Sequence, residues 1–377
     1  MDNFIAVNTP LLNGNEKKYL NECIDTGWIS SEGPFVKKLE DNFSRIMGRE
    51  HGVAVCNGTV ALELALKAIG IGPGDEVIMP TFTIISCALA AIRLGAKPVL
   101  VDSDPITWNM DIAQIEAKIT DKTKAIMVVH TYGLPVDMNP IIALAQKYDL
   151  KIIEDAAEMH GQTYYGKPCG SFGEISTFSF YPNKLVTTGE GGMVLMDDES
   201  IRDKCQLLRN LAFEPKQRYL HEELGWNFRM SNLQAAVGVA QLERIGEFIE
   251  RKRLMGRYYD ECLADIKELT RPLAKTAYAQ NIYWVYGIVL DDKVMSGKEL
   301  MQQLHQEGIG TRAFFYPMHQ QPVLLKMGLF KDERYPVAEH LARQGIYIPS
   351  GLALTQNEMK AVSDKLKKIL IKGSVTC

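Results

Sequence analysis

The sequence has little that would suit it to nucleic acid or to a membrane. Its 377 residues carry 42 Lys and Arg against 46 Asp and Glu, a formal net charge of −4. This balance leaves no basic footprint for nucleic acid, and no block of like charges suggests a tail. The most apolar stretch, residues 82–92, is too short to cross a bilayer and ends at Arg93. We therefore expect a soluble protein with no nucleic-acid or membrane partner.

Signals for export and for a disulfide framework are also missing. Residues 1–10 have no basic start and no long apolar core, so we expect no signal peptide and a mature chain that begins at Met1. The seven cysteines are odd in number and scattered, and no two of them form a Cys-x-x-Cys pair. We expect reduced thiols, a cytoplasmic location and a site without a metal.

What is present is an alternation of short apolar runs and helical patterns through the first two thirds of the chain. The predicted strands are residues 76–79, 98–101, 125–129, 151–153, 175–180 and 193–196. This rhythm predicts a mainly parallel sheet with helices on both faces. Ligands of such sheets bind at the strand ends.

The length and the 46% hydrophobic content are enough for two domains. A long amphipathic stretch after Ser231 is predicted to link them. Beyond it, a strand at 282–290, a helix at 297–307 and a strand at 308–315 predict a smaller α+β domain. We place the large domain at 1–248 and the small domain at 249–377.

A lysine and an acid follow two of the predicted strands. Lys184 lies between an aromatic, hydroxyl-rich strand and a Thr-Thr-Gly-Glu-Gly-Gly turn, and Asp155 ends the run from Lys151. A lysine can form an imine with an aldehyde, and a carboxylate can stabilise a protonated ring nitrogen. Taken singly, such residues are more often a solvated lysine and a helix cap. Together, with small residues that let backbone approach a ligand, they predict a pyridoxal phosphate (PLP) site.

A further segment, Asn57-Gly58-Thr59, precedes a helical run. Free amides and the positive end of a helix suit a phosphate, although an ordinary helix cap explains the same three residues. Ser179, shortly before Lys184, can add a hydroxyl to the same phosphate, or it can be a satisfied hydroxyl at a strand end.

Five segments occur in an order that resembles a known family. They are residues 57–59, 72–78, 154–161, 179–192 and 225–236. Together they resemble the DegT/DnrJ/EryC1/StrS-type sugar aminotransferases of PLP fold type I over nearly the whole chain. The resemblance implies an α/β fold, with a large domain built on a mainly parallel mixed sheet between helices and a smaller α+β C-terminal domain.

The resemblance also implies roles for individual residues. Lys184 would be catalytic, Asp155 would pair with the pyridinium and Glu158 would lie near the ring hydroxyl. Gly58, Thr59 and Ser179 would bind the cofactor phosphate. Asn227 would reach the phosphate of the neighbouring subunit's cofactor, so the active unit would be a homodimer with shared sites.

One position departs from the family. Family members often have an aromatic residue where Ile84 stands, so the ring face would be covered here by Ile84 or by Phe82.

The lysine also bears on the reaction. A related branch has histidine at the position of Lys184 and removes a hydroxyl from its sugar, so lysine favours amino transfer. Residues 223–230 and 158–160 look most like the members that aminate C4 of GDP-4-keto-6-deoxy-D-mannose with L-glutamate as the donor. A UDP- or dTDP-linked keto sugar would meet the same cofactor machinery, so it stays an alternative.

Six residues are candidates to contact the substrate, although each can equally be a core aromatic, a turn histidine or a loop residue. They are Phe82, His160, Arg229, Phe314, Tyr316 and His319.

Two other functions stay open at this point. The first is a PLP-binding protein without turnover, although the chain has no DNA-binding module to pair with a sensor role. The second is a PLP lyase or desulfurase acting on amino acids. O-antigen and lipopolysaccharide biosynthesis is the pathway that the resemblance suggests, but the residues themselves do not fix it.

Overall fold

The computed structural model describes residues 4–214 and 216–373 of the chain. Within them, seven strands form one sheet in the order β1-β9-β8-β5-β4-β2-β3. Their bounds are β1 (His51–Val55), β2 (Glu76–Pro80), β3 (Lys97–Val101), β4 (Thr123–Val129), β5 (Lys151–Asp155), β8 (Ile175–Ser179) and β9 (Gly192–Met196). β9 runs against β1 and β8, and the other neighbouring pairs are parallel. The predicted mainly parallel mixed sheet is confirmed.

Helices cover both faces of this sheet because its strands are apolar on both sides. On β2, Val77 and Met79 belong to one core cluster and Ile78 to the other. Helices α3 (Gly58–Ala68), α4 (Ser86–Arg93) and α6 (Glu199–Arg209) contribute to the first cluster. Helices α1 (Glu16–Thr26), α2 (Pro34–Ile46), α5 (Met138–Tyr148) and α7 (Asn232–Leu242) contribute to the second. The sheet therefore lies in the middle of three layers. β6 (Thr163–Tyr164) and β7 (Lys167–Pro168) form a separate short ribbon.

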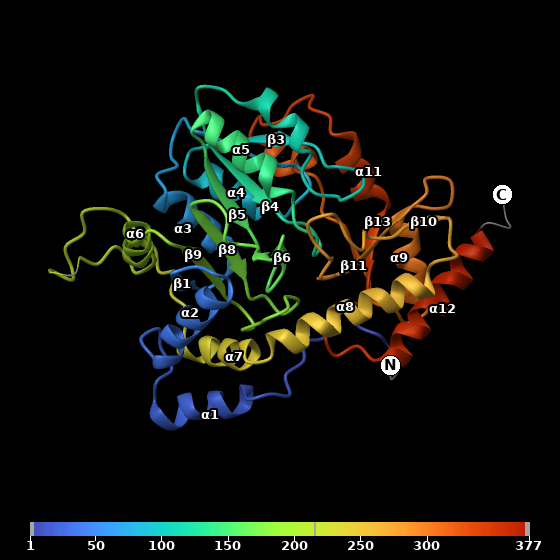
Figure 1. Cartoon of the computed structure of the whole chain (residues 1–377), viewed down its shortest axis with the longest axis horizontal. Coiled ribbons are helices and arrows are strands. Elements are labelled where there is room, and N and C mark those ends of the chain that lie inside the picture. Colours follow the sequence, from blue (N-terminus) through green and yellow to red (C-terminus); the bar gives the residue numbers. More distant parts are fainter. Residues whose placement is uncertain (1–3, 215, 374–377) are drawn as a thin grey trace.

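A second sheet lies in the C-terminal third, on the right of Figure 1. It is antiparallel throughout, in the order β10 (Leu269–Thr270), β11 (Tyr286–Leu290), β13 (Gly345–Ile348) and β12 (Arg312–Ala313). Helices α8 (Ile245–Cys262), α9 (Gly297–Gln306) and α12 (Gln356–Gly373) share a core with it. On its other side, Val289 of β11 and Phe314 join the core of the large sheet, together with α11 (Pro336–Gln344) and the short α10 (Pro322–Lys326). The two sheets thus share part of one core.

The long helical stretch predicted after Ser231 consists of two helices. Ser231 caps α7 through a capping box with Gln234, and α7 ends before Glu243. Arg244 has φ −115° and ψ 11°, outside the helical region, and α8 begins after it and runs toward the small sheet (Figure 1). The predicted boundary at 248/249 falls inside α8 and stays a prediction.

The two C-terminal strands are shorter than predicted. Residues 282–285 do not continue β11, because Tyr283 has φ 51°, a left-handed conformation that interrupts an extended run. Of residues 308–315, only Arg312 and Ala313 pair as β12.

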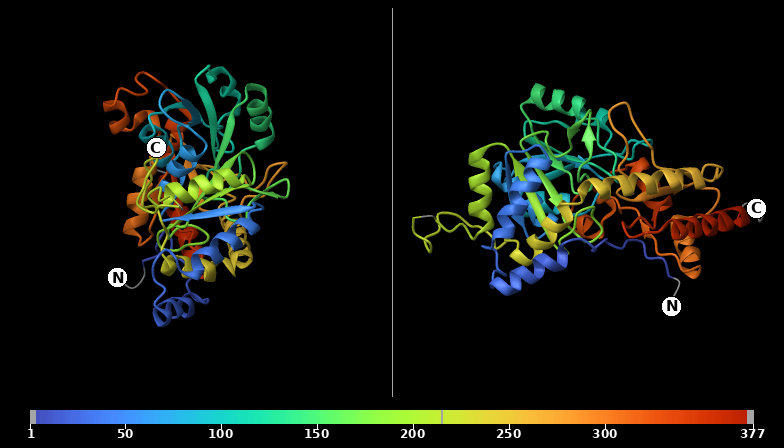
Figure 2. Two further views of the ribbon diagram at one scale, coloured as in Figure 1. Left: turned by 90° about the vertical axis from the view of Figure 1, so that its left-hand side faces the viewer. Right: turned by 60° about the horizontal axis from the view of Figure 1, so that its bottom comes forward.

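The first described residues of the chain lie against the small sheet. Ile5 forms a parallel bridge with Ile309, and the amide of Ser350 donates to the carbonyl of Val7 at 2.9 Å. Figures 1 and 2 both show this N-terminal segment running from α1 beneath α8 toward the C-terminal elements.

No helix in the described ranges is long and apolar enough to span a membrane. The cysteines among these residues are free thiols.

Candidate active site

A cavity of about 420 Å³ opens at the carboxyl ends of β4, β5 and β8, at the N-terminus of α3. Both the large and the small sheet regions contribute to its walls. Seven of the predicted cofactor residues line it: Gly58, Thr59, Ile84, Asp155, Glu158, Ser179 and Lys184. These residues come from segments far apart in the sequence, and the strand ends of the parallel sheet bring them together.

Lys184 lies in the turn that follows β8. Its Nζ is 3.7 Å from Oε1 of Glu158, and it lies 4.0 Å from the centre of the Trp284 ring. Burial lowers the pKa of Lys184 below that of an ordinary lysine, while Glu158 and Asp155 act in the opposite direction. A lysine in such surroundings is more readily present as the neutral amine, the form that attacks a carbonyl.

Glu158 lies between Lys184 and the segment after β4. Its Oε2 accepts a hydrogen bond of 2.6 Å from the amide of Tyr132. Burial raises the pKa of Glu158 to about 7, against the attraction of Lys184. The Lys184–Glu158 pair can therefore hold or release a proton near neutral pH.

Asp155 is the last residue of β5, and its carboxylate is held at both oxygens. Oδ1 accepts from the amide of Ala157 at 3.1 Å, and Oδ2 accepts from the thiol of Cys87 at 3.3 Å. Burial raises the pKa of Asp155, and these two donors and the charge of Lys184 partly oppose that rise. A buried carboxylate with few cationic neighbours is suited to pair with a protonated ring nitrogen.

The N-terminus of α3 forms the polar end of the cavity. Asn57 caps the helix by accepting from the amide of Val60 at 3.0 Å, so the capping role and the location at the cavity occur together. A Cβ on Gly58 would lie 2.7 Å from Cβ of Ser179, so only glycine allows this close approach. Thr59 shares a hydrogen bond of 2.8 Å with Ser86, which also lines the cavity.

These residues fit PLP. The helix end and its hydroxyls suit a phosphate, Asp155 suits the ring nitrogen and Lys184 suits the aldehyde. The buried side-chain oxygen of Asn183, which also lines the cavity, has no hydrogen-bond partner within the described part of the chain. An unpaired buried acceptor at this position fits a site built to receive a polar ligand.

Ile84 and Phe82 differ in their relation to the cavity. Ile84 lines it and is 45% exposed, whereas Phe82 is fully buried and packs against Tyr132, Phe314 and Phe315. Phe82 and Phe314 thus lie in an aromatic cluster behind the wall, and Phe315 is the member of the cluster that reaches the cavity.

The other proposed substrate residues are not brought to this cavity. His160 is buried among Phe43, Phe178 and Phe180, and its Nδ1 accepts from the amide of Val186 at 3.1 Å. Burial lowers the pKa of His160 to about 3.

His319 and Tyr316 line a different hollow. His319 is held by Thr81 at 2.9 Å and by Glu339 at 3.1 Å.

Two residues of the segment before α7 also lie away from the cavity. Arg229 bonds the side chain of Asn210, and Asn227 is exposed. In this chain, neither residue is among those that line the cavity.

Several cavity residues could not be predicted from the sequence. Trp284, Arg312 and Tyr347 come from the small domain, about a hundred positions or more beyond Lys184, and no local motif marks them. Ser86, which lines the cavity, and Cys87, which donates to Asp155 behind it, lie in the apolar stretch 82–92, where hydropathy was the only visible pattern.

The fold and this site define a PLP-dependent aminotransferase. The model of the DegT/DnrJ/EryC1/StrS aminotransferase family matches residues 10–367, and the chain belongs to this family.

Named relatives and solved structures agree with this assignment. The chain is 43% identical to the GDP-perosamine synthase of Caulobacter vibrioides, over 97% of this chain and 98% of that protein. It is 42% identical to the GDP-perosamine synthase of Escherichia coli O157:H7, over 97% and 98% of the two chains. The crystal structure of the aminotransferase TlmJ from Streptoalloteichus hindustanus matches with a TM-score of 0.91 and 28% identity, over 99% of this chain and 100% of that one.

Proposed function

We propose that the chain transfers an amino group from L-glutamate to the 4-keto carbon of GDP-4-keto-6-deoxy-D-mannose, which forms GDP-perosamine. The observation that carries the aminotransferase chemistry is the group of Asp155, which is buried, and Lys184 and Glu158, which are largely buried, beside the polar N-terminus of α3. The choice of sugar is supported by the two relatives that are named GDP-perosamine synthases.

Lys184 is the residue that we propose to move the proton. Bound PLP would supply a sink for the electrons released when a C–H bond next to nitrogen breaks. Nζ of Lys184, with its lowered pKa and little contact with water, can accept that proton and return it at a neighbouring carbon. Glu158, at 3.7 Å, can stabilise the ammonium form between the two transfers.

Asp155 and the α3 end have holding roles in this proposal. The carboxylate of Asp155, fixed by Ala157 and Cys87, would keep a ring nitrogen protonated. Gly58, Thr59 and Ser179 would bind the phosphate through amides and hydroxyls, and Ile84 would lie on the ring face.

The segment between α6 and α7 supports a homodimer. It extends away from the body of the molecule (Figure 1), and it exposes Tyr219 at 82% and Leu224 at 90%. Large apolar side chains so fully in water favour burial against a second copy. Asn227, near the base of this segment and outside its own chain's cavity, would then contact the partner's cofactor phosphate.

We also propose a cytoplasmic location and a place in O-antigen synthesis for lipopolysaccharide. The free state of the cysteines that the structure describes fits a reducing compartment. Fractionation of the native cells tests the location.

The first test is the visible absorbance of the purified protein before and after L-glutamate, with Lys184→Ala as the comparison. The wild type should show the band of bound PLP and lose it with glutamate, while a folded Lys184→Ala variant should not respond. A band that persists with glutamate would contradict the donor, and an active alanine variant without added amine would contradict the role of Lys184.

The second test supplies glutamate with a panel of GDP-, UDP- and dTDP-linked keto sugars. Turnover confined to the GDP-linked 4-keto sugar is the expected result. Turnover only with a UDP or dTDP sugar would reject the substrate but keep the reaction, and release of sulfide or alanine from cysteine would favour a lyase instead.

A further inference from the structure

Lys252 is a buried lysine that the proposed reaction does not use. It lies on α8, the helix that joins the two sheet regions, and only 2% of the residue is exposed. Burial lowers its pKa to about 7, and no carboxylate among residues 4–214 and 216–373 contributes to that shift. Its Nζ instead donates to two main-chain carbonyls, that of Trp284 at 2.7 Å and that of Ser350. A buried lysine without an acid partner is costly, so its hydrogen bonds need an explanation.

The first of these carbonyls belongs to the residue that covers Lys184. The Trp284 ring lies 4.0 Å from Nζ of Lys184, and its Nε1 donates to the carbonyl of Asn183 at 2.8 Å. The indole nitrogen of Trp284 is thus held by the carbonyl of Asn183, and the main-chain carbonyl of Trp284 is held by the amine of Lys252. The residues just before Trp284 add little regular structure, since Tyr283 has φ 51° and β11 begins only at Tyr286.

The second carbonyl ties the same amine to the segment that leaves β13, beside the start of β11. Ser350 follows β13, its hydroxyl accepts from the amide of Tyr286 at 2.9 Å, and its amide donates to Val7. Lys252 therefore connects α8 to the segments before β11 and after β13.

We propose that Lys252 is a positioning residue for the proposed reaction: by holding the Trp284 and Ser350 carbonyls, it keeps the indole of Trp284 over the amine of Lys184. The ring keeps water away from that amine, and its face favours the ammonium form during proton transfer. Lys252 contacts neither Lys184 nor the other reacting atoms in the cavity. It therefore acts on Lys184 only through Trp284. This inference rests on the proposed role of Lys184.

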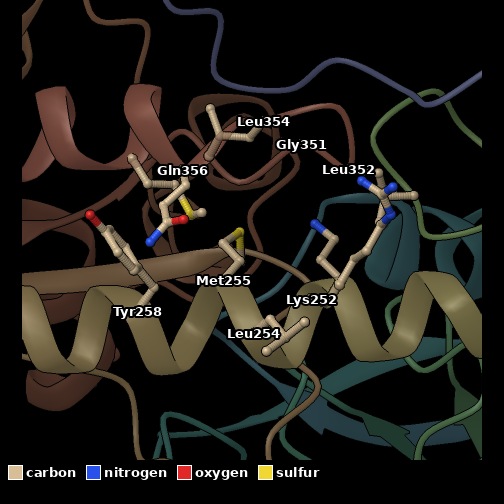
Figure 3. A pocket seen from close by; sticks show the side chains of 10 residues that line it. Lys252, Leu254, Met255, Tyr258, Gly351, Leu352, Leu354 and Gln356 are labelled. Carbon is tan, nitrogen blue, oxygen red and sulfur yellow. The ribbon is translucent and has the colours of Figure 1, made fainter.

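The surroundings of Lys252 allow a clean substitution. Figure 3 shows Lys252 leaving α8 beside Met255 and Leu352, with its amine directed away from the helix. These residues line a second cavity, of about 320 Å³, on this side of the molecule. Methionine has nearly the length and volume of lysine, so Lys252→Met removes the donors without overfilling the site.

Arg251 offers a matched control. It lies on the same helix and lines the same second cavity, but its guanidinium bonds Glu247 at 2.9 Å on the surface. Arg251→Met removes a positive charge from the neighbouring position of α8 and leaves the hydrogen bond from Lys252 to the Trp284 carbonyl intact.

The experiment measures how fast trace acetic anhydride labels Lys184 in the cofactor-free protein at pH 9, with peptide mass spectrometry and Lys37 as the internal reference. The side chain of Lys37 is 80% exposed, so its labelling should not change. In Lys252→Met we expect labelling of Lys184 to rise about tenfold, as for a coupling of about 1.4 kcal/mol between residues of one network. Arg251→Met should match the wild type.

A double variant separates the proposal from a general loosening of the fold. Trp284→Leu should raise labelling of Lys184 by itself, and Lys252→Met should add nothing in that background. If the two effects multiply, or if Lys252→Met leaves Lys184 unchanged, the proposal is wrong.

If Lys252→Met does not fold, Lys252→Gln takes its place because its amide keeps two donors on a shorter side chain. It should raise labelling less, and only while Trp284 is present. No rise in this folded variant would overturn the proposal.

The cofactor-loaded enzyme gives a second readout. Lys252→Met should lower kcat and leave KM for the nucleotide sugar unchanged, since Lys252 does not line the substrate cavity. Absence of turnover in the wild type would refute the proposed function alone, because the labelling result does not depend on it.

Discussion

His160 makes the stability of the protein depend on pH in a way that can be calculated. The pKa of this buried histidine falls from 6.5 to about 3 in the folded protein, because burial disfavours the charged ring and Lys184 repels it. In the unfolded chain the ring has its ordinary pKa. A group with a lowered folded pKa contributes stability that is complete above the unfolded pKa and is lost as the pH falls toward the folded one.

The window is therefore pH 6.5 down to about 3. At pH 4 His160 binds a proton in the unfolded state but remains mostly neutral in the folded state. Each unit by which the pH lies below the unfolded pKa is worth about 1.4 kcal/mol. His160 should thus cost the folded state about 3 kcal/mol at pH 4 and little at pH 7. His160→Asn removes the titration and keeps an acceptor for the amide of Val186.

Urea unfolding of wild type and His160→Asn at pH 7, 6, 5 and 4, at one protein concentration, measures this difference. The protonation of Asp155 and Glu158 takes place in both proteins and cancels in the comparison. The free energy of unfolding of the variant should fall by about 3 kcal/mol less than that of the wild type. Parallel curves would mean that the ring is protonated in the folded state, and the reasoning from burial would fail.

Three further predictions concern the cofactor and the assembly. Asp155→Asn should keep the fold and lower kcat roughly a hundredfold, because a neutral amide stabilises a protonated ring far less than a carboxylate does; an unchanged kcat would contradict this role. Gly58→Ala should weaken PLP binding about tenfold or more in a fluorescence titration, since its Cβ would lie 2.7 Å from that of Ser179. Gly72→Ala, with open space at the Cβ position, is the control and should bind normally. Leu224→Asp should weaken the proposed dimer about tenfold or more in sedimentation velocity, and an unchanged dimer would remove Leu224 from the interface.

The sequence was sufficient where chemistry is local. The apolar runs located six of the seven strands of the large sheet and missed β1, and Asp155 and Ser179 stand at the very ends of β5 and β8. The cap at Asn57 and the glycine after it were readable as a helix start with a polar ligand. Such features depend on a few residues that are close together in the sequence, so they can be recognised from the sequence alone.

What the sequence could not provide depends on contacts across long separations. The ring of Trp284 lies against the amine of Lys184 although 100 positions separate the two residues in the sequence. Only the packing of the small sheet brings the ring there. His160 follows Glu158 by two residues, yet its side chain turns into the core beside Phe43. The interruption at Tyr283 comes from a left-handed φ in a run of strand-forming residues, where local propensity points the other way.

The N-terminal segment has a consequence for how the chain is made. Residues 5–9 hydrogen-bond to residues 308–310 and to residues 350–353, so these contacts can form only after about three hundred intervening residues have been synthesised. All seven strands of the large sheet have been synthesised by the end of β9, so they can pair on the ribosome while the N-terminal segment still waits for its partners. Closure of the small sheet region around this segment, including the Ser350 carbonyl that Lys252 holds, therefore follows the synthesis of every strand of the large sheet. The active cavity takes its second wall from that region, so it is complete only once residues as far along the chain as Tyr347 have been synthesised and folded.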